Sequence, residues 1–500
     1  MIKGIHLNAP LFGFDNSYAR LPEHFFARLS PTPVSRPRLV STNEDLAVHL
    51  KLDPALLDSA EGTQILAGNR VPGDAEPLAM AYAGFQFGGW VPQLGDGRAI
   101  LLGEVVDRDG VRRDIQLKGC GQTPFSRNGD GRAALGPVLR EYILSEAMHA
   151  LGVPTTRALA VVTTGEQVRR ERSLPGAVLT RVAQSHIRVG TFQFFAARQD
   201  TDALRLLADH VIDRHYPDTR ESAQPYLALL DAVVDAQATL VATWKLIGFI
   251  HGVMNTDNTS ICGETIDYGP CAFMDTYHPD RVYSSIDHAG RYAYGNQAPI
   301  AHWNLAGFAQ TLIPLIDSDA AQSREMAQEM INTFPAKFEA AYNAGVREKL
   351  GFQSSKEEDP VLMEDLLTVM ADHHADFTLV FRRLCLLETD HRSADGVVRE
   401  LFDEPAAFDQ WVVRWRARLR DEANGEPGRQ QRMLTVNPAY IPRNHRVEEV
   451  IRAAEDHGDF MPFERLHQVL RRPYAEQESA IQYQNPPRPE EIVQATFCGT

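Results

Sequence analysis

Three polar residues near the middle of the chain have the side-chain types needed to bind a metal ion and to accept a proton. Asp257 and Asn258 are adjacent, and Asp267 follows a short distance later. Carboxylate and amide oxygens are the ligands that Mg²⁺ prefers beside nucleotide phosphates. A carboxylate can also accept the proton of an attacking hydroxyl group. Asn258 and Asp267 are therefore candidate metal ligands, with the carboxylate of Asp257 beside them.

The stretch 251–258 reads HGVMNTDN and has the length and both ends of a kinase catalytic loop, H-R-D-L-x-x-x-N. Residues 267–269, DYG, resemble the D-F-G motif whose aspartate binds magnesium. Val253 stands where the kinase loop has its catalytic aspartate. Either motif alone is typical of an Asx-rich turn. Their order, after a long helical pattern, favours a metal site that lacks the ordinary kinase base.

A lysine and a glutamate upstream fit the same kind of site. Lys118 ends a strand-like segment, and Glu141 lies on a predicted helix. In kinase-like folds a strand lysine paired with a helix glutamate contacts the phosphates of ATP. Each residue alone is usually a solvated surface charge. The order of strand lysine, helix glutamate and Asp-x-Gly motif makes chance occurrence of all three much rarer than that of any one.

Glycines and arginines supply further candidates for phosphate binding. Gly95, Gly97 and Arg98 precede the first strong strand, and Asp130 with Gly131 precedes the predicted helix. Glycine lets backbone N–H groups approach phosphates closely, although Asp-Gly is first of all a turn signal. The arginines that we single out are Arg181, inside an apolar segment, and Arg188, shortly after it. A guanidinium group gives a forked, permanently charged contact to phosphate.

The first half of the chain must position these groups with strands and one helix. Residues 99–106 and 111–118 flank the turn Asp109-Gly110 and predict a β-hairpin. A helix is expected from Pro137 to about residue 150, stopped by Gly152. Two further strands are expected at 158–164 and 177–183, joined by a charged loop.

The second half has mainly helical patterns. Helices are expected at 226–250, at 320–350 with a break near Pro335, at 361–386 and at 446–469. The paired histidines His373-His374 lie in such a pattern, and we interpret them as structural or solvated. The whole is predicted to be α+β, with a small β-rich lobe, a larger helical lobe and the octapeptide at their junction.

Bulk properties limit the partners. The chain has 500 residues with a net charge of −16, which argues against a nucleic-acid partner because phosphate binding depends on clustered Lys and Arg. No signal peptide and no membrane-spanning segment is expected. The five cysteines include no C-x-x-C pair and indicate a reducing, cytoplasmic location. Cys498 stands out because it lies in a polar tail.

Long blocks of the sequence together resemble one family, selenoprotein O (SelO/YdiU), a group of kinase-like proteins. The blocks are 96–98 (DGR), 116–119 (QLKG), 123–132 (TPFSRNGDGR), 140–142 (REY), 179–181 (LTR), 185–192 (SHIRVGTF), 251–258, 267–270 (DYGP), 287–292 (DHAGRY), 437–438 (NP), 443–444 (RN) and Cys498. The resemblance implies a protein-kinase-like two-lobed fold with N- and C-terminal extensions. It divides the chain into an extension (1–80), an N-lobe (81–192), a helical C-lobe (193–472) and a tail (473–500).

The resemblance also implies an activity. Family members transfer AMP from ATP to hydroxyl side chains of proteins and release pyrophosphate, and some use UTP to transfer UMP. Carried over by motif, Asp257 is the proton acceptor, and Asn258 and Asp267 hold Mg²⁺ or Mn²⁺. The implied nucleotide-binding residues are Gly95, Gly97, Arg98, Lys118, Asp130, Gly131, Glu141, Arg181, Arg188 and Asp267.

Two alternatives stay open, and one feature departs from the family. The chain could be an atypical kinase that transfers the γ-phosphate, or a non-catalytic nucleotide-binding pseudokinase. In some family members a C-terminal cysteine pairs with a cysteine after the D-x-G motif. Here Cys498 is present, but residues 276–287 contain no cysteine, and Cys271 is the nearest candidate. We therefore do not expect a regulatory disulfide.

Overall fold

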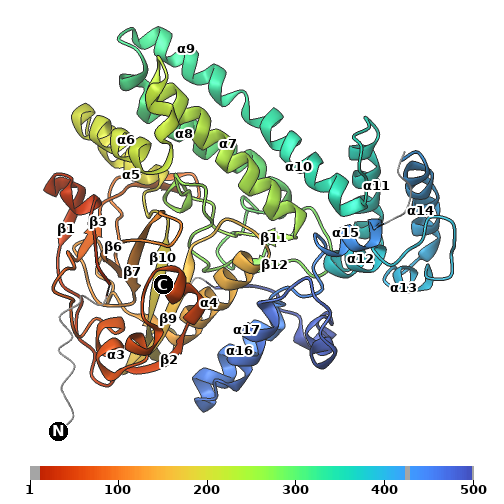
Figure 1. The fold of residues 1–500 in the computed structure, drawn as a ribbon, viewed down its shortest axis with the longest axis horizontal. Coiled ribbons are helices and arrows are strands. Elements are labelled where there is room, and N and C mark those ends of the chain that lie inside the picture. Colours follow the sequence, from red (N-terminus) through yellow and green to blue (C-terminus); the bar gives the residue numbers. More distant parts are fainter. Residues whose placement is uncertain (1–11, 423–427, 498–500) are drawn as a thin grey trace.

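A large antiparallel sheet occupies the N-terminal part of the molecule, and helices make up most of the rest (Figure 1). The computed structural model describes residues 12–422 and 428–497. The sheet has the strand order β1-β3-β6-β7-β10-β9-β2, with β8 paired to β10. Its strands are β1 (Phe26–Arg28), β2 (Arg38–Thr42), β3 (Leu78–Met80), β6 (Ala99–Val106), β7 (Arg112–Lys118), β8 (Ala133–Ala134), β9 (Arg157–Arg169) and β10 (Ser173–Ala183). Strands from the first 80 residues thus form both edges of the sheet.

Helices cover both faces of this sheet. The short helices α1 (Glu44–His49), α2 (Pro54–Leu57) and α3 (Ala60–Leu66) bury their apolar residues against one face, where Ile115 of β7 is fully buried. Helix α4 (Leu135–Ala150) packs on the other face through residues such as Leu139 and Ile143. Burying apolar side chains on both faces removes them from water, which is the main favourable term in folding.

Helix α4 is itself enclosed from outside. Helices α16 (Asn444–His457) and α17 (Met461–Leu470) pack on it, and Tyr142 of α4 lies against Phe463 with ring centroids 5.3 Å apart. These two helices are close to the sheet in space, although they come from the far end of the chain (Figure 1). The last part of the sequence therefore completes the core around α4.

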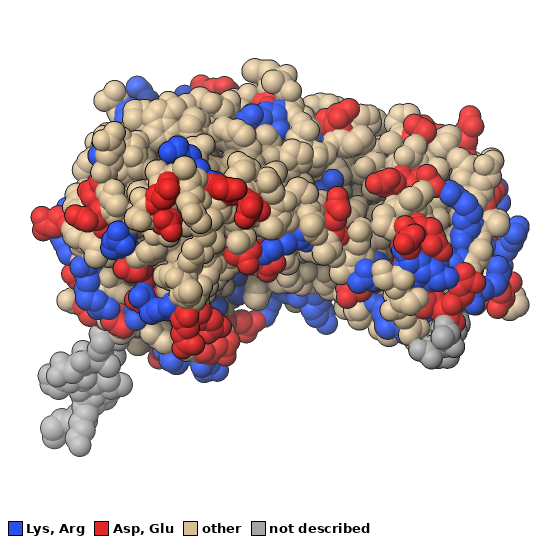
Figure 2. Space-filling model, turned by 90° about the horizontal axis from the view of Figure 1, so that it is seen from above, with Lys and Arg blue, Asp and Glu red and all other residues tan. Residues whose placement is uncertain are grey.

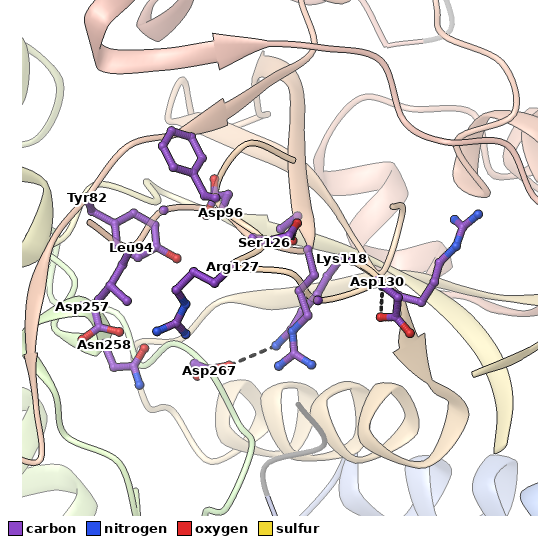
Figure 3. Close-up of a pocket in the computed structure, with 18 of the residues that line it drawn as sticks. Tyr82, Leu94, Asp96, Lys118, Ser126, Arg127, Asp130, Asp257, Asn258 and Asp267 are labelled. Carbon is purple, nitrogen blue, oxygen red and sulfur yellow. Dashed lines mark hydrogen bonds and ion pairs between the residues drawn. The ribbon is translucent and has the colours of Figure 1, made fainter. Parts of the chain in front are cut away.

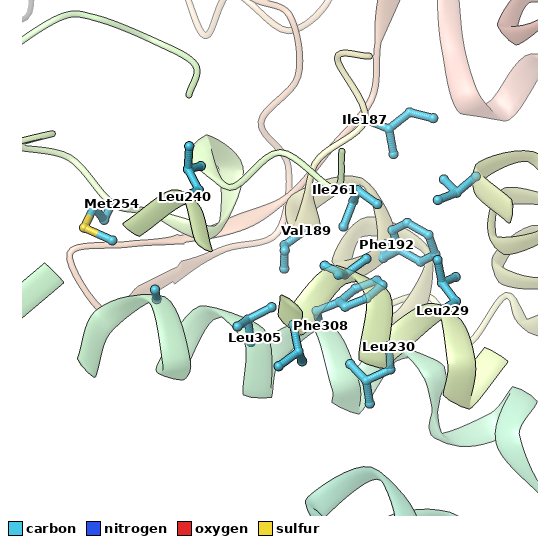
Figure 4. Packing of buried hydrophobic residues seen from close by; sticks show 14 of the residues in the cluster. Ile187, Val189, Phe192, Leu229, Leu230, Leu240, Met254, Ile261, Leu305 and Phe308 are labelled. Carbon is cyan, nitrogen blue, oxygen red and sulfur yellow. The ribbon is translucent and has the colours of Figure 1, made fainter. Parts of the chain in front are cut away.

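The other helices pack into two further groups, each around its own hydrophobic cluster. One group packs around α5 (Val189–Ala196), α7 (Pro225–Leu246) and α8 (Gln297–Ile316), where Phe192 meets Phe308 (Figure 4). The remaining helices are α6 (Thr201–His215), α9 (Ala320–Ile331), α10 (Phe334–Leu350), α11 (Asp359–Asp372), α12 (Phe377–Leu384), α13 (Gly396–Arg399), α14 (Pro405–Arg420) and α15 (Arg429–Leu434). Two short ribbons, β4 (Gly84–Gln86) with β5 (Gly89–Val91) and β11 (Phe249–Ile250) with β12 (Ala272–Phe273), complete the fold.

Helix α7 is long and apolar enough to cross a membrane by length and composition, which differs from the expectation that no segment would be. Over half of its apolar window, 56%, is buried inside the molecule. It packs against α8 and α10. Its apolar character is accounted for by this position in the protein core.

One expected helix ends earlier than its sequence pattern predicts, and two others are each divided into two helices. The helix expected at 226–250 ends at Leu246, because Gly248 adopts a left-handed conformation (φ 73°) and the chain continues into β11. The helix expected at 446–469 is two helices separated at Gly458 (φ 66°). The helix expected at 361–386 breaks after Asp372, and Asp376 caps the next helix by accepting a hydrogen bond from the Leu379 N–H.

The charged loop expected between residues 165 and 175 is mostly strand. Strands β9 and β10 continue as a ribbon to a tight turn at residues 170–172, with a register shift between Pro175 and Ala177. A β-bulge of this kind bends the ribbon, and polar side chains suit its solvent-exposed end. The hairpin predicted at residues 99–118, by contrast, is present as β6 and β7 around Gly110 (φ 80°).

Charges of both signs are interspersed over the face of the molecule seen in Figure 2. Exposed ion pairs on the protein surface include Arg20 with Asp15 and Arg28 with Glu76. Exposed pairs of this kind contribute little to stability.

Candidate functional site

A cavity of about 250 Å³ lies between the sheet and the segments that follow α7 (Figure 3). Its lining residues are Tyr82, Gln86, Leu94, Gly95, Asp96, Gly97, Arg98, Ala99, Lys118, Phe125, Ser126, Arg127, Gly129, Asp130, Gly131, Arg132, Arg170, Arg181, Arg188, Asp257, Asn258 and Asp267. All the residues singled out from the sequence line this cavity except Glu141, which bonds to two of them. Residues from strands, loops and a helix start thus converge on one polar space.

The floor of the cavity is an ion network centred on Glu141. This helix residue accepts hydrogen bonds from Lys118 Nζ through Oε2 and from Arg181 Nη1 through Oε1, the latter at 3.2 Å. Lys118 and Arg181 come together because β7 and β10 are adjacent, with Leu179 opposite Lys118 in the register. All three side chains are at least nine-tenths buried. Buried charges are stable only when paired and hydrogen-bonded, as they are here.

Gln116 extends this network and was not expected from the sequence. Its Oε1 accepts a hydrogen bond from Arg181 Nε at 3.1 Å, and its Nε2 donates to Asp96 Oδ2 at 3.1 Å. Gln116 lies directly opposite Arg181 in the β7–β10 register. A buried glutamine with both ends used fixes the guanidinium orientation. Its position two residues before Lys118, on the same strand face, was the signal available in the sequence.

Asp267 faces the same network from the other side. Its Oδ1 lies 3.0 Å from Lys118 Nζ, and its backbone is in the left-handed region (φ 68°). Burial raises the pKa of this carboxyl, but the positive charges of Lys118, Arg98 and Arg181 outweigh it and hold the pKa well below its usual range. Asp267 is therefore ionised at neutral pH, the state that a metal ligand requires.

Asn258 lies on the loop from 251 to 258, on the same side of the cavity as Asp257 (Figure 3). Its Nδ2 donates to the Val253 carbonyl at 3.1 Å, which leaves the amide oxygen as the atom available to a cation. Asn258 and Asp267 thus offer two hard oxygen donors. Within residues 12–422 and 428–497 there is no group of three or more His, Cys, Asp or Glu arranged to hold a metal. Two oxygen donors fit a cation that takes its remaining ligands from phosphate and water, as Mg²⁺ does.

Asp257 is almost fully buried beside Asn258. Burial raises the pKa of its carboxyl to about 6, and the hydrogen bond from Gln86 and the charge of Arg188 limit that rise. Arg188 Nη1 also donates to the Asp257 carbonyl at 3.2 Å, while its guanidinium lies 4.3 Å from the Tyr82 ring centroid. A carboxyl whose pKa is close to neutral can accept and release a proton.

The loop that carries Gly95 and Gly97 and the loop that carries Gly131 are joined by hydrogen bonds. Thr123 Oγ1 donates to the Asp96 carbonyl at 2.7 Å, and Ser126 Oγ donates to the Gly97 carbonyl. Gly95 (φ 121°) lies so close to Phe125 that an added Cβ would be 2.3 Å from its ring. Gly95 requires glycine because a side chain there would need both the space that Phe125 fills and a left-handed backbone.

Asp130 and Gly131 lie on the second of these loops, at the edge of the cavity. Asp130 accepts a hydrogen bond from Arg170 Nη1 at 2.9 Å, which lowers the pKa of its carboxyl. Gly131 (φ 67°) lies against the Gly121 backbone, 2.1 Å from where its Cβ would be. Arg170, which the sequence did not single out, lines the cavity and is paired with Asp130.

Arg127 is the second residue that sequence reasoning missed. Its side chain points into the cavity toward the side where Asn258 and Asp267 lie (Figure 3). Arg127 (φ 48°) and Asn128 (φ 72°) are both in the left-handed region, which is uncommon for residues other than glycine. Among the described residues, its guanidinium forms no hydrogen bond or ion pair. The strained turn thus places the Arg127 guanidinium in the cavity, where no described protein group pairs with its positive charge.

The cysteines give no structural support for a disulfide near this site. Cys271 is buried and free, and burial raises the pKa of its thiol to about 12. Cys498, the other residue considered for a disulfide, lies outside the described residues. Neither His373 nor His374 is among the residues that line the cavity. His374 Nδ1 lies 2.8 Å from Asp403 Oδ2.

Comparison with known proteins identifies relatives over nearly the whole chain. The family model described as protein adenylyltransferase SelO matches residues 11–471. A protein nucleotidyltransferase YdiU of Rhodopseudomonas palustris (strain HaA2) is 63% identical over 489 residues, covering 98% of this chain and 99% of the relative. A protein nucleotidyltransferase YdiU of Methylorubrum extorquens is 61% identical over 496 residues, with the same coverage of each chain. The chain therefore belongs to the SelO family of protein adenylyltransferases.

Proposed function

We propose that this protein transfers AMP from ATP to hydroxyl side chains of other proteins and releases pyrophosphate. The observation that carries the proposal is the cation-rich cavity in which Lys118, Arg181 and Arg188 face Asn258 and Asp267, in a chain of the SelO family. A polyphosphate with several negative charges needs such a concentration of cations. The relatives are named protein nucleotidyltransferases, which supports protein hydroxyls as acceptors.

The proposed reaction is a single displacement at the α-phosphorus. The acceptor oxygen forms a bond to the α-phosphorus, and the bond between that phosphorus and the bridging α–β oxygen breaks. Pyrophosphate leaves with the electron pair, and Asp257 takes the hydroxyl proton. Lys118, Arg181 and Arg188 stabilise the negative charge that develops on the leaving pyrophosphate.

Asn258 and Asp267 would hold a divalent cation, Mg²⁺ or Mn²⁺, in this reaction. When bound, the cation would neutralise phosphate charge and orient the nucleotide. Glu141 keeps Lys118 and Arg181 in place beneath the phosphates. The loop residues Gly95, Gly97, Arg98, Asp130 and Gly131 would contact the rest of the nucleotide. Arg127 belongs in this set as a further phosphate ligand, because its guanidinium has no protein partner among the described residues.

The proposal includes a kinase-like arrangement in two lobes. Residues 81–192 would form the N-lobe, to which the extension 1–80 adds edge strands. Residues 193–472 would form the helical C-lobe, and 473–500 the tail. The large antiparallel sheet and the position of the cavity beside it support this division. We also propose a cytoplasmic location.

A γ-phosphate-transferring kinase is the main alternative, and ATP labelled at either the α- or the γ-phosphate distinguishes the two. We expect only the α-label to become attached to protein, with release of pyrophosphate. Transfer of only the γ-label would refute AMP transfer. Nucleotide binding without transfer of either label, with Mg²⁺ or Mn²⁺, would indicate a non-catalytic pseudokinase. Parallel reactions with α-labelled UTP measure the preference between AMP and UMP transfer.

A further inference from the structure

The β4–β5 hairpin is attached to the loop that carries Asp257 through three consecutive residues. The Phe85 N–H donates to Thr256 Oγ1 at 2.8 Å, and the Phe87 N–H donates to Asn255 Oδ1 at 3.0 Å. Between them, Gln86 Nε2 donates to Asp257 Oδ2 at 3.2 Å. The hairpin and the loop lie 171 positions apart in the sequence for the first of these contacts.

The hairpin holds Gln86 in a fixed place. Its two-residue turn, Phe87 (φ 51°) and Gly88 (φ 82°), has the left-handed backbone typical of a type I′ turn. Phe85 packs against Trp303 of α8, with ring centroids 5.2 Å apart, and Phe87 packs against Tyr292 at 5.0 Å. Because successive strand residues point to opposite faces, Gln86 faces away from this aromatic contact and toward the cavity.

Among the described residues, the Asp257 carboxylate has no hydrogen-bond partner in the protein other than Gln86. Its Oδ1 is buried and has no hydrogen-bond partner among the described residues. On that side it lies against Gly84, where an added Cβ would be 2.7 Å from Oδ1. Oδ2 therefore remains as the oxygen available to a substrate hydroxyl, and Gln86 is the side chain that bonds to it.

We propose that Gln86 is a positioning residue that sets the orientation of the Asp257 carboxylate for proton transfer. The amide uses one lone pair of Oδ2, so that the other is directed at the acceptor hydroxyl in the cavity. Without this donor the carboxylate can rotate about its terminal bond, since Oδ1 is not hydrogen-bonded. This inference rests on the proposed function of Asp257 as the group that takes the hydroxyl proton while the oxygen–phosphorus bond forms.

Gly84 lies beside the same carboxylate on its Oδ1 side, where an added side chain would meet Oδ1. Its backbone is not in the left-handed region, so an alanine there causes a steric change without left-handed strain. The methyl group would press on Oδ1, and the nearest other atom is Thr256 Oγ1 at 3.1 Å. Gln86 thus holds the carboxylate by a hydrogen bond, and the absence of a side chain at Gly84 leaves the space that Oδ1 occupies.

The test removes the hydrogen bond while retaining the side-chain length. Gln86→Met should lower kcat for AMP transfer by about 10- to 100-fold, because a small misplacement of a reacting group costs that much. The dissociation constant for ATP should stay within about two-fold of that of the wild type. Gln93→Met is the matched control, because Gln93 is an exposed glutamine on the adjoining loop. A normal kcat in Gln86→Met, or a loss explained by weaker ATP binding, would overturn the proposal.

A double-mutant cycle shows whether Gln86 acts through Asp257. Residual transfer by Asp257→Ala and by Asp257→Ala with Gln86→Met should agree within about two-fold, since no carboxylate remains to be positioned. A further ten-fold loss in the double variant would mean that Gln86 acts independently, against the proposal. Introduced alone, Gly84→Ala should reduce kcat for AMP transfer. Introduced into Asp257→Ala, it should cause no further loss.

The same cycle separates this inference from the proposed function. If the wild type transfers the γ-label instead of the α-label, AMP transfer is refuted, while the coupling of Gln86 to Asp257 is still read on the γ-label. If AMP transfer occurs and the two substitutions act independently, only the positioning role fails. If the wild type transfers neither label, both proposals fail.

Discussion

Lys118 Nζ lies 3.0 Å from Asp267 Oδ1, although the two residues are 149 positions apart in the sequence. The lysine also donates to Glu141, so one ammonium group joins a strand, a helix and the loop after α7. A phosphate and a divalent cation arriving in the cavity would change the partners of both charged groups. This ion pair therefore links the proposed cation-binding side of the site to its proposed phosphate-binding side.

Removing the Lys118 charge should remove activity. Lys118→Met leaves Glu141 and Asp267 without a shared cation, and the cavity loses one of the charges that stabilise phosphate. We expect AMP transfer to fall by at least about 10²-fold and ATP binding to weaken. The measurement is α-label transfer together with titration calorimetry of ATP.

Lys337→Met is the control for that variant. Lys337 forms a partly exposed ion pair with Asp231 outside the cavity, and solvent-accessible pairs contribute about 0–1 kcal/mol. Equal losses in the two lysine variants would mean that the effect of Lys118→Met is not specific to the cavity.

Arg127 should contribute to nucleotide affinity through the phosphates. A charge-assisted hydrogen bond is worth roughly 1.5–3 kcal/mol, so Arg127→Ala should weaken ATP binding by about 10- to 100-fold. Adenosine, which has no phosphate, should bind equally well to the variant and the wild type. Arg169→Ala is the control, since Arg169 is exposed at the end of β9. Equal weakening of ATP and adenosine binding would contradict a phosphate contact.

Asp267 should be needed for the metal dependence of nucleotide binding. In the wild type, addition of Mg²⁺ or Mn²⁺ is expected to strengthen ATP binding, and chelation should reverse this. In Asp267→Asn the charged oxygen ligand is lost, so binding should no longer respond to the cation. Calorimetric titrations with and without the cation measure this difference. A full metal response in the variant would assign the cation to other ligands.

Lys349 should make the stability of the protein depend on pH. This lysine is buried in the helical part of the molecule, where its Nζ donates to Asn437 Oδ1 at 2.8 Å. Burial lowers its pKa to about 7, whereas the unfolded chain has a lysine pKa of about 10.4. Between these values the unfolded state binds more protons, so the free energy of unfolding rises with pH, by up to about 1.4 kcal/mol per pH unit.

Lys349→Met removes this contribution and supplies the reference. The difference in Tm between the wild type and Lys349→Met should increasingly favour the wild type as the pH rises from 7 to 9. Other titrating groups are common to both proteins and cancel in the difference. A difference that stays constant across this range would mean that Lys349 keeps its proton in the folded state.

Arg443 should be essential for stability without touching the nucleotide site. It is fully buried and donates from Nη1 to Asp275 at 2.7 Å and to Asp376 at 2.6 Å. Arg443→Met would leave two buried carboxylates without their cation, a loss of roughly 3–5 kcal/mol. Thermal unfolding should show a lower Tm, and adding Asp376→Asn should restore part of it. No recovery in the double variant would argue against uncompensated charge as the cause.

The sequence predicted which residues come together in the cavity better than it predicted the ends of the helices and strands that carry them. Lys118, Glu141 and Asp267 belong to recognisable motifs, so their pairing could be expected from the order of those motifs along the chain. Gln116 shares a strand face with Lys118, but its bonds to Arg181 and Asp96 follow only from the strand register. Arg127 could not be expected, because its position comes from a strained turn. Gln86 could not either, since its partner Asp257 is brought to it only by the tertiary fold.

Helix ends were mispredicted for a local physical reason. Apolar periodicity continues past Leu246 and past residue 457, but glycines with left-handed backbone, Gly248 and Gly458, end both helices. Periodicity reports which face is buried, whereas the end of a helix depends on one or two capping residues. The same limit applies to His373-His374, which fall at a break between α11 and α12.

The enclosure of α4 by α16 and α17 has a consequence for the timing of protein synthesis. Glu141 lies on α4, and residues 444–470 cover the outer face of that helix. While the ribosome has not yet released those residues, α4 lacks the packing of α16 and α17 on that face, and Glu141 lacks the support that this packing gives. A nascent chain that already contains every residue of the cavity lining therefore still has an incompletely packed site, and the cavity reaches its final form only after residues 444–470 have been made.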